Sequence, residues 1–308
     1  MHDVENVDPA EPSRKEAKTR RNKERHALVQ RLQSEDAYDL ANPLDECGTP
    51  IPLTCTCCGE HRVAEQHCMR RYCPSCQPLV TAKRHARWSA ALSKLQWPLF
   101  ITLTIPNSED PESLRFLRKK WGCFRRRKII ADKVRGGIAT FEVTNKGQGW
   151  HPHLHAILDC QWLAIHTPAP APTDSKAVIK QKCEFAHREL SLQWANMIDN
   201  EQAIVWAHRV YGDQAISEVL KYAAKGSDLI NSPQPIAPML RVLSSTRTLS
   251  GFGSLHPLPN PDRDTGAVCI CDKCGAEKSF MPDEIIKFLC GPTSPSSEGR
   301  TVQPRNQN

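Results

Sequence analysis

Three histidines, His151, His153 and His155, recur at every second position of one short segment. If this segment is a strand, its side chains alternate between two faces, so the three imidazoles share one face while Leu154 lies on the other, in a core. Two imidazoles held in this way on a rigid strand can converge on one metal ion. The spacing predicts that His153 and His155 form this pair, and that His151, nearer the preceding turn, either assists or only flanks them.

A carboxylate belongs to the preceding strand, across a turn that the composition of residues 145–149 indicates. Glu142 lies between Phe141 and Val143, which must face the core, so its side chain is expected on the histidine face. One carboxylate and two imidazoles with open positions suit a hard divalent ion such as Mg²⁺ or Mn²⁺. Such an ion polarises a phosphoryl oxygen without supplying the nucleophile. The alternative interpretation is a set of exposed histidines that bind no metal.

One of the four tyrosines, Tyr222, falls in a helical pattern with Glu218 four residues before it and Lys225 three after it. These spacings place side chains on one helix face. A phenol with a pKa near about 10 is a weak nucleophile at neutral pH, but Lys221, Lys225 and a metal-bound phosphate would favour the phenolate. Attack on a DNA phosphate would give a 5′-phosphotyrosine and a free 3′-hydroxyl, after which Glu218 could act as a base. The alternative is a tyrosine packed on an amphipathic helix, with Glu218 in a surface ion pair.

The 14 cysteines are clustered, with seven between residues 47 and 76 and four between residues 269 and 290. No apolar signal region opens the chain, so we expect the cytoplasm as its compartment and metal sites rather than disulfides. Tetrahedral zinc takes four ligands. The first block predicts a structural zinc site, for which the expected ligands are Cys55, Cys58, Cys73 and Cys76. The alternatives in that block are Cys57, Cys68, His61 and His67. The second block predicts a self-contained zinc knob formed by Cys269, Cys271, Cys274 and Cys290.

Hydrophobic periodicity and turn residues indicate the elements that must position these side chains. Between residues 97 and 228 the expected order is β-α-β-β-α-β followed by one more helix. This order predicts an α+β fold of the ferredoxin-like type, an antiparallel sheet with helices on one face, to which small zinc-binding segments are added. The expected strands are 99–105, 138–144, 153–158 and 203–210, and the expected helices are 79–95, 111–133, 175–198 and 213–225.

Composition divides the chain outside this core. A polar, basic stretch at the start is expected to be a disordered or loosely helical arm. A Pro/Ser/Gly-rich extension follows the core, and a Ser/Pro/Gln/Asn-rich tail, expected to be disordered, follows the second cysteine block. The expected divisions are 1–45 (arm), 46–96 (zinc segment and helix), 97–228 (core), 229–268 (extension), 269–290 (knob) and 291–308 (tail).

Charge favours a nucleic-acid partner. The formal net charge is +7, and between Arg115 and Arg135 ten Lys and Arg residues accompany a single acid, Asp132. This patch suits a phosphate backbone, although a solvated helix face is the alternative. No segment approaches the roughly 20 uncharged apolar residues of a membrane helix, so no membrane partner is expected.

Through these motifs the chain resembles the replication initiators of rolling-circle plasmids, which are HUH endonucleases. It looks most like the group whose single catalytic tyrosine is accompanied by a glutamate. The family's first motif is matched by Phe100–Ile105, its metal motif by His151–His155 and its third motif by Glu218–Lys225. The segment Cys68–Gln77 resembles the region before the first motif, and the resemblance covers about residues 55–255.

The resemblance implies a DNA endonuclease and strand transferase in which Tyr222 is the nucleophile and Glu218 the hydrolytic residue. Its substrate would be single-stranded DNA at a plasmid origin hairpin. The enzyme would stay joined to the 5′ end while a host helicase and polymerase extend the 3′ end, and a second transfer would close the circle. The second cysteine block and the tail have no counterpart in the family pattern.

Two other functions remain open from the sequence. One is an HUH-type single-strand DNA transposase, although some of those carry two tyrosines on one helix and only Tyr222 lies on this one. The other is a non-catalytic zinc-containing DNA-binding regulator. The presence of Glu218, Tyr222, His153 and His155 at the required spacings argues against the regulator.

Overall fold

The computed structural model describes residues 13–201, 203, 205–210, 219–220, 229–256, 271–276 and 280–282 of the 308. The chain forms two compact units. The first spans Met1–Cys47 and His67–Pro261, and the second spans Gly48–Gln66 and Asp262–Asn308. None of the helices in the described part of the chain is both long and apolar enough to cross a membrane.

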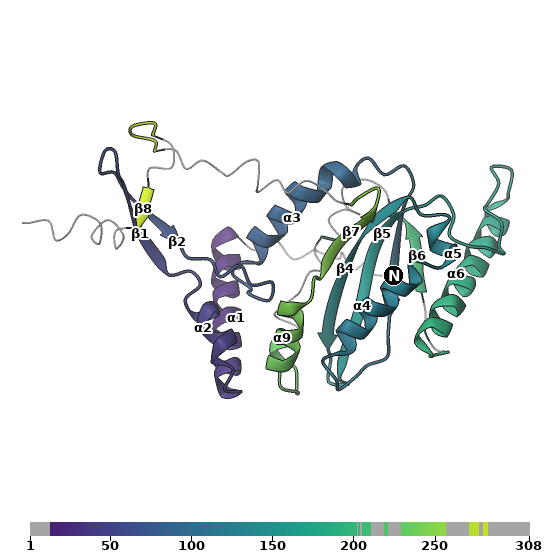
Figure 1. Ribbon diagram of the computed structural model, residues 1–308, viewed down its shortest axis with the longest axis horizontal. Helices are drawn as coiled ribbons and strands as arrows, with labels where there is room; N and C mark the ends of the chain where they lie inside the picture. The colour runs from purple at the N-terminus through teal and green to yellow at the C-terminus, as the bar shows by residue number, and fades with distance from the viewer. Residues whose placement is uncertain are drawn as a thin grey trace, which may run out of the picture. The chain divides into compact units, whose positions relative to one another are not determined.

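The first unit is built on a five-stranded antiparallel sheet with the strand order β6-β3-β5-β4-β7 (Figure 1). Strand β3 lies between β5 and β6, so segments far apart in the sequence are neighbours in the sheet. An α+β fold with antiparallel sheets, as expected from the sequence, is therefore confirmed. The strands are β3 (Pro98–Thr104), β4 (Gly136–Asn145), β5 (Trp150–Asp159), β6 (Val205–Arg209) and β7 (Leu249–Gly253).

One face of this sheet packs against α4 (Ser113–Phe124) and α6 (Lys176–Ile198). Alternate strand residues, among them Leu103 and Leu154, are fully buried in the same core as Trp194 of α6. The Trp194 indole also donates a hydrogen bond of 2.7 Å to the Thr104 carbonyl oxygen at the end of β3. We call this side of the sheet the helix face.

The opposite side carries the odd-numbered residues of β5, including the three histidines, and we call it the histidine face. Its apolar end forms a second core in which Phe100 and Ile157 pack with Trp88 of α3 (Gln77–Leu92). The helical residues Val219 and Leu220 are also buried in this core. The expectation that helices cover one face only is therefore wrong, because apolar side chains at this end of the histidine face also need cover.

The N-terminal arm is not disordered where the structure describes it. Residues Arg14–Ser34 form α1, which begins with a capping box between Ser13 and Glu16, and Tyr38–Asp45 form α2. Although α1 is strongly basic, Leu28, Val29 and Leu32 share one of its faces and are buried in the core. Composition concealed this short apolar stripe, which is enough to fix the helix.

The described part of the extension, residues 229–256, is also more ordered than its composition indicates. It supplies α9 (Ala237–Ser245) and the edge strand β7. The Glu35 carboxylate accepts hydrogen bonds from the backbone N–H groups of Ile236 and Ala237, which satisfies the start of α9. Gly251 of β7 is required by close packing, because a Cβ atom there would lie 2.7 Å from the Trp88 ring.

The expected helix 111–133 is interrupted. Helix α4 ends at Phe124, and a short helix α5 (Lys128–Ala131) follows after Arg127, whose backbone is extended. This break redirects the chain so that Ile129 and Ile130 are buried in the core. The basic patch of the sequence is therefore divided between two helices and their connection.

The second unit contains a three-stranded antiparallel sheet, β2-β1-β8, whose strands are β1 (Pro50–Cys55), β2 (His61–Glu65) and β8 (Phe280–Pro282). The knob expected at residues 269–290 is not self-contained, because β8 pairs with β1 from the first cysteine block. The expected segment 46–96 is likewise split, since only Gly48–Gln66 belongs to this unit. Short strands gain stability by joining a larger sheet, even when their partner is distant in sequence.

Candidate active site

The β4–β5 hairpin brings Glu142, His153 and His155 together on the histidine face. Glu142 and His153 are direct cross-strand partners in the antiparallel register. Glu142 Oε2 lies 3.0 Å from His153 Nε2 and 3.5 Å from His155 Nε2. All three side chains are largely buried, so the three ligand atoms meet in a protected position rather than on an open surface.

Hydrogen bonds on the far side of each ring orient the two imidazoles. His153 Nδ1 donates to the backbone carbonyl oxygen of His151 at 3.1 Å, so in the neutral ring a cation at this site would meet the lone pair of Nε2. The Thr102 hydroxyl of β3 lies 3.0 Å from His155 Nδ1. Such partners fix the ring and its tautomer in metal sites. The sequence did not single out Thr102, although it lies in the first motif, at a position that faces the histidines.

This donor set suits a small divalent cation. Two ligand atoms at right angles, each about 2.1 Å from one octahedral ion, are about 3.0 Å apart, which matches the contact between Glu142 and His153. In addition, the buried hydroxyl of Thr140, which is opposite His155 in the register, has no hydrogen-bond partner among the described residues. A water bound to an ion at this site would satisfy such a group.

Glu142 is charged at neutral pH despite its burial. Burial alone raises the pKa of this carboxyl, but hydrogen bonds and charge from His153 and His155 outweigh that effect and lower the pKa to about 2. A buried carboxylate that faces two imidazole nitrogens is strongly stabilised by a cation placed between them.

His151 occupies the same face but stands apart from the three ligand atoms. Its Nδ1 lies 2.7 Å from the side-chain oxygen of Asn107, in the loop after β3. Its ring centroid is 5.5 Å from that of His153. The group of candidate ligands in the described residues contains His153, His155 and Glu142 without His151, so the geometry favours a flanking position for it.

The residues expected to carry the nucleophilic chemistry, Tyr222, Glu218 and Lys225, lie outside the described residues. Between Glu218 and Tyr222 in the chain, Val219 and Leu220 are helical and fully buried. They share a core with Phe100, whose ring centroid is 5.5 Å from that of His155. The described part of this segment therefore packs on the same face of the sheet as the histidines.

The cysteines form two groups of four, and neither is the set expected from the sequence. Within the first unit, Cys47 and Cys68 join Cys73 and Cys76. Within the second unit, Cys55, Cys58, Cys271 and Cys274 lie together. The expected combination of Cys55 and Cys58 with Cys73 and Cys76 is therefore wrong. Of the four cysteines of the expected knob, Cys271 and Cys274 lie with Cys55 and Cys58. The other two, Cys269 and Cys290, lie outside the described residues.

The correction has a physical origin in chain topology. The prediction paired cysteines that are near in sequence, whereas Cys55 and Cys274 are 219 residues apart and meet because β8 pairs with β1. The matched Cys-x2-Cys pairs 55–58 and 271–274 were the signal that could have identified this group. In the other group, Cys47 lies eight residues before the next cysteine, Cys55, so no Cys-x2-Cys spacing marks it as a ligand.

Both groups have the geometry of a zinc site. Four sulfurs about 2.3 Å from one tetrahedral zinc ion are about 3.8 Å apart. The Sγ–Sγ distances in the first unit are 3.4 Å for Cys47–Cys76 and 3.8 Å for Cys68–Cys76. In the second unit they are 3.8 Å for Cys55–Cys274 and 3.6 Å for Cys58–Cys271. The cysteine groups could therefore hold a metal such as zinc.

Zinc content tests this arrangement. We expect two zinc ions per chain, falling to one in Cys73→Ser and to one in Cys274→Ser, because each variant removes one ligand from a different group. Elemental analysis of the purified proteins measures the ratio. Cys123→Ser is the matched control, since Cys123 belongs to neither group. Loss of both ions in either single variant would show that the two groups do not bind independently.

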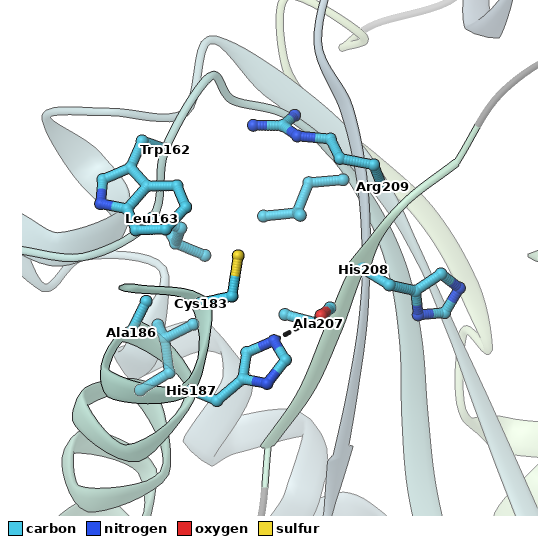
Figure 2. A pocket seen from close by; sticks show the side chains of 10 residues that line it. Trp162, Leu163, Cys183, Ala186, His187, Ala207, His208 and Arg209 are labelled. Carbon is cyan, nitrogen blue, oxygen red and sulfur yellow. Dashed lines mark hydrogen bonds between the residues drawn. The ribbon is translucent and has the colours of Figure 1, made fainter. Parts of the chain in front are cut away.

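A pocket on the helix face does not contribute to this site. It lies between β6, α6 and the loop at residues 160–167, and its largely apolar lining includes Cys183 and Trp162. His187 Nε2 donates to the Ala207 carbonyl oxygen at its border (Figure 2). Its volume of about 90 Å³ is too small for a nucleotide. Figure 2 also shows that the side chain of His208 points away from this pocket.

The Thr102 hydroxyl provides a test of ring orientation. Thr102→Val removes the group beside His155 Nδ1 without changing the shape of the side chain much, so we expect affinity for Mn²⁺ to fall by about 10- to 100-fold. Isothermal titration with Mn²⁺ measures the change. Thr102→Ser keeps the hydroxyl and should retain most of the affinity. Equal affinity in Thr102→Val and the wild type would contradict an orienting role.

A family model described as "Replication protein" matches residues 61–267, about two thirds of the chain. The matched region includes β3, the β4–β5 hairpin with its three candidate ligands, and the segment that contains Tyr222. The comparisons with curated proteins and with solved structures gave no match.

Proposed function

The chain belongs to the replication protein family, and from this premise we propose that it is a plasmid replication initiator that nicks single-stranded origin DNA through Tyr222. The observation that carries the proposal is the convergence of Glu142, His153 and His155 on one point of the histidine face. Val219 and Leu220, next to Glu218 and two residues before Tyr222, are buried on this same face.

The topology of the sheet supports the proposed HUH core. The first four strands of the first unit lie in the sheet in the order β6-β3-β5-β4, followed by β7 at the edge. This is the order of an antiparallel β-α-β-β-α-β sheet, the ferredoxin-like arrangement proposed for this core. It places β3 directly beside β5, so the first and second motifs of the resemblance are adjacent across the sheet.

In the proposed reaction, Tyr222 is the nucleophile. The phenol gives its proton to solvent, and the phenolate oxygen attacks the phosphorus of the scissile phosphate. A bond forms between this oxygen and the phosphate of the 5′ end, the bond from phosphorus to the 3′ oxygen breaks, and that oxygen takes a proton from water to become a 3′-hydroxyl. Lys225 favours the phenolate by its charge, and Glu218 serves as the base for the hydrolytic or second transfer step. Glu142, His153 and His155 would hold Mg²⁺ or Mn²⁺, which when bound supplies electrostatic stabilisation at the phosphoryl oxygens.

Basic side chains offer contacts for the phosphate backbone. On α4 and in the connection after it, Arg118, Lys119, Arg126 and Arg127 are exposed. Arg125 is partly buried by stacking over the rings of Trp121 and Phe252, so it also serves the fold. Phosphate contacts of this kind predict that DNA affinity decreases steeply as salt concentration rises.

A covalent-adduct assay tests the proposal. The purified protein is mixed with Mn²⁺ and labelled single strands that tile the DNA around its own gene, and the products are separated on denaturing gels. We expect a protein–DNA band that requires the metal and maps to one nick site beside a hairpin. Adducts that map instead to the two ends of a mobile element would favour the transposase. DNA binding without any adduct would favour the non-catalytic regulator.

A further inference from the structure

An exposed tryptophan lies on the histidine face and belongs to neither hydrophobic core of the described residues. Trp206 of β6 is 63% exposed, whereas its strand neighbours Val205 and Ala207 are buried. Among the described residues Trp206 makes no ring contact. A large aromatic side chain gives most of its stabilisation through burial, so this degree of exposure points to a role outside the core.

The sheet register places Trp206 in line with the candidate metal ligands. It pairs with Thr102 of β3, and Thr102 pairs with His155 of β5. Cross-strand partners project on the same face, so the indole, the Thr102 hydroxyl and the His155 imidazole form one row. At about 4.8 Å between neighbouring strands, the Cα atoms of Trp206 and His155 are about 10 Å apart.

The neighbourhood of Trp206 leaves one side of it accessible. Strand β6 pairs only with β3 among the described strands, so it forms an edge of the sheet. His208, two residues further along the same face, packs on Phe100 with a centroid distance of 5.0 Å. The apolar end of the histidine face is thus closed by packing, while the row of Trp206 and Thr102 remains beside the ligands.

We propose that Trp206 is a positioning residue that stacks on an unpaired base of the single-stranded DNA substrate, close to the scissile phosphate. The inference rests on the proposed function and assigns to it a side chain that contacts a base of the substrate. Indole rings stack on any nucleobase. A rigid ring on the same sheet as His153 and His155 would limit how the strand approaches the metal site.

An abasic scan of the substrate tests the stacking contact directly. Fluorescence anisotropy measures the Kd of a labelled single strand, and of versions that lack one base at each position, for the wild type and Trp206→Ala. The measurement is made with Ca²⁺ in place of Mn²⁺, which separates binding from cleavage. We expect Trp206→Ala to weaken binding of the intact strand by about 5- to 150-fold, and Trp206→Phe to recover most of the loss.

The same scan identifies the base that stacks. At one position, removal of the base should weaken DNA binding by the wild type but leave the Kd of Trp206→Ala unchanged. The missing base and the missing indole each delete the same stacking contact, so the second change has no further effect. Trp97→Ala is the matched control. Trp97 is 47% exposed but precedes β3 at the end remote from Thr104 and His153, so its replacement should leave the Kd and the scan unchanged.

The outcomes separate this inference from the proposed function. If the wild type forms the covalent adduct while Trp206→Ala binds and scans like the wild type, the stacking role is overturned and the nuclease stands. If no adduct forms but the scan shows the coupling, the stacking contact stands and the nuclease fails. Thermal unfolding of Trp206→Ala near the wild-type temperature excludes misfolding as the cause of weaker binding.

Discussion

Tyr222→Phe is expected to abolish the covalent protein–DNA adduct while the Kd for single-stranded DNA stays within about twofold of the wild type. Phenylalanine keeps the ring but lacks the oxygen that would bond to phosphorus, so no residual covalent chemistry is possible at this position. The loss should therefore be complete on a denaturing gel, and strand cleavage should fall by at least about 10³-fold. Anisotropy measures the Kd in parallel.

Tyr38→Phe provides the control for this experiment. Tyr38 is an exposed residue of α2, so its replacement should leave both adduct and binding intact. An adduct that persists in Tyr222→Phe would show that another side chain attacks the phosphate. The match of the family model to residues 61–267 would be unaffected by that result, but the assignment of Tyr222 would be wrong.

The histidine face was predictable because it depends on a local rule. Alternation along a strand fixes which residues share a face, and a short hairpin fixes which residues are opposite, so Glu142 could be placed near His153 from the sequence. The structure has this register, with Glu142 and His153 as direct partners. The role of these residues in binding metal remains a prediction that the Mn²⁺ measurements test.

The cysteine groups were not predictable by the same reasoning. Their composition depends on the pairing of β1 with β8, which brings Cys58 and Cys271 together across 213 residues. No local pattern encodes such a pairing, and thiolates of several cysteines in one block are chemically equivalent as zinc ligands. Matched Cys-x2-Cys spacing favours pairing residues 55–58 with 271–274, whereas proximity in sequence favours pairing them with 73–76.

Composition was equally misleading for α1 and α9. A helix needs only a narrow apolar face to pack, and the basic residues around Leu28 and Leu32 hid that face from an argument based on average polarity. Trp206 shows the converse case. Its exposure depends on the position of β6 at the edge of the sheet. From the sequence alone, a tryptophan in a short apolar strand is expected to be buried in the core.

Glu142→Gln is expected to abolish Mn²⁺ binding and DNA cleavage without unfolding the protein. The amide has the shape of the carboxylate but carries no charge, so the site loses the attraction that favours a divalent cation. The amide can also donate a hydrogen bond to the Nε2 lone pair of His153, which satisfies the buried groups without any ion. We therefore expect metal affinity to fall by more than about 100-fold while the zinc content stays the same.

Thermal unfolding with and without Mn²⁺ measures this effect independently of DNA. An ion that binds only the folded state stabilises it by about 2.7 kcal/mol at a concentration 100 times its Kd, so the wild type should gain in Tm. Glu142→Gln should show no such gain, and His166→Ala, at an exposed histidine outside the site, should respond like the wild type. If Glu142→Gln gained as much as the wild type, the ion would bind elsewhere. We expect Mn²⁺ to raise the Tm only of proteins that keep Glu142, and Glu142→Gln to lose DNA cleavage. Together these results would show that the reaction depends on an ion bound at this point of the histidine face.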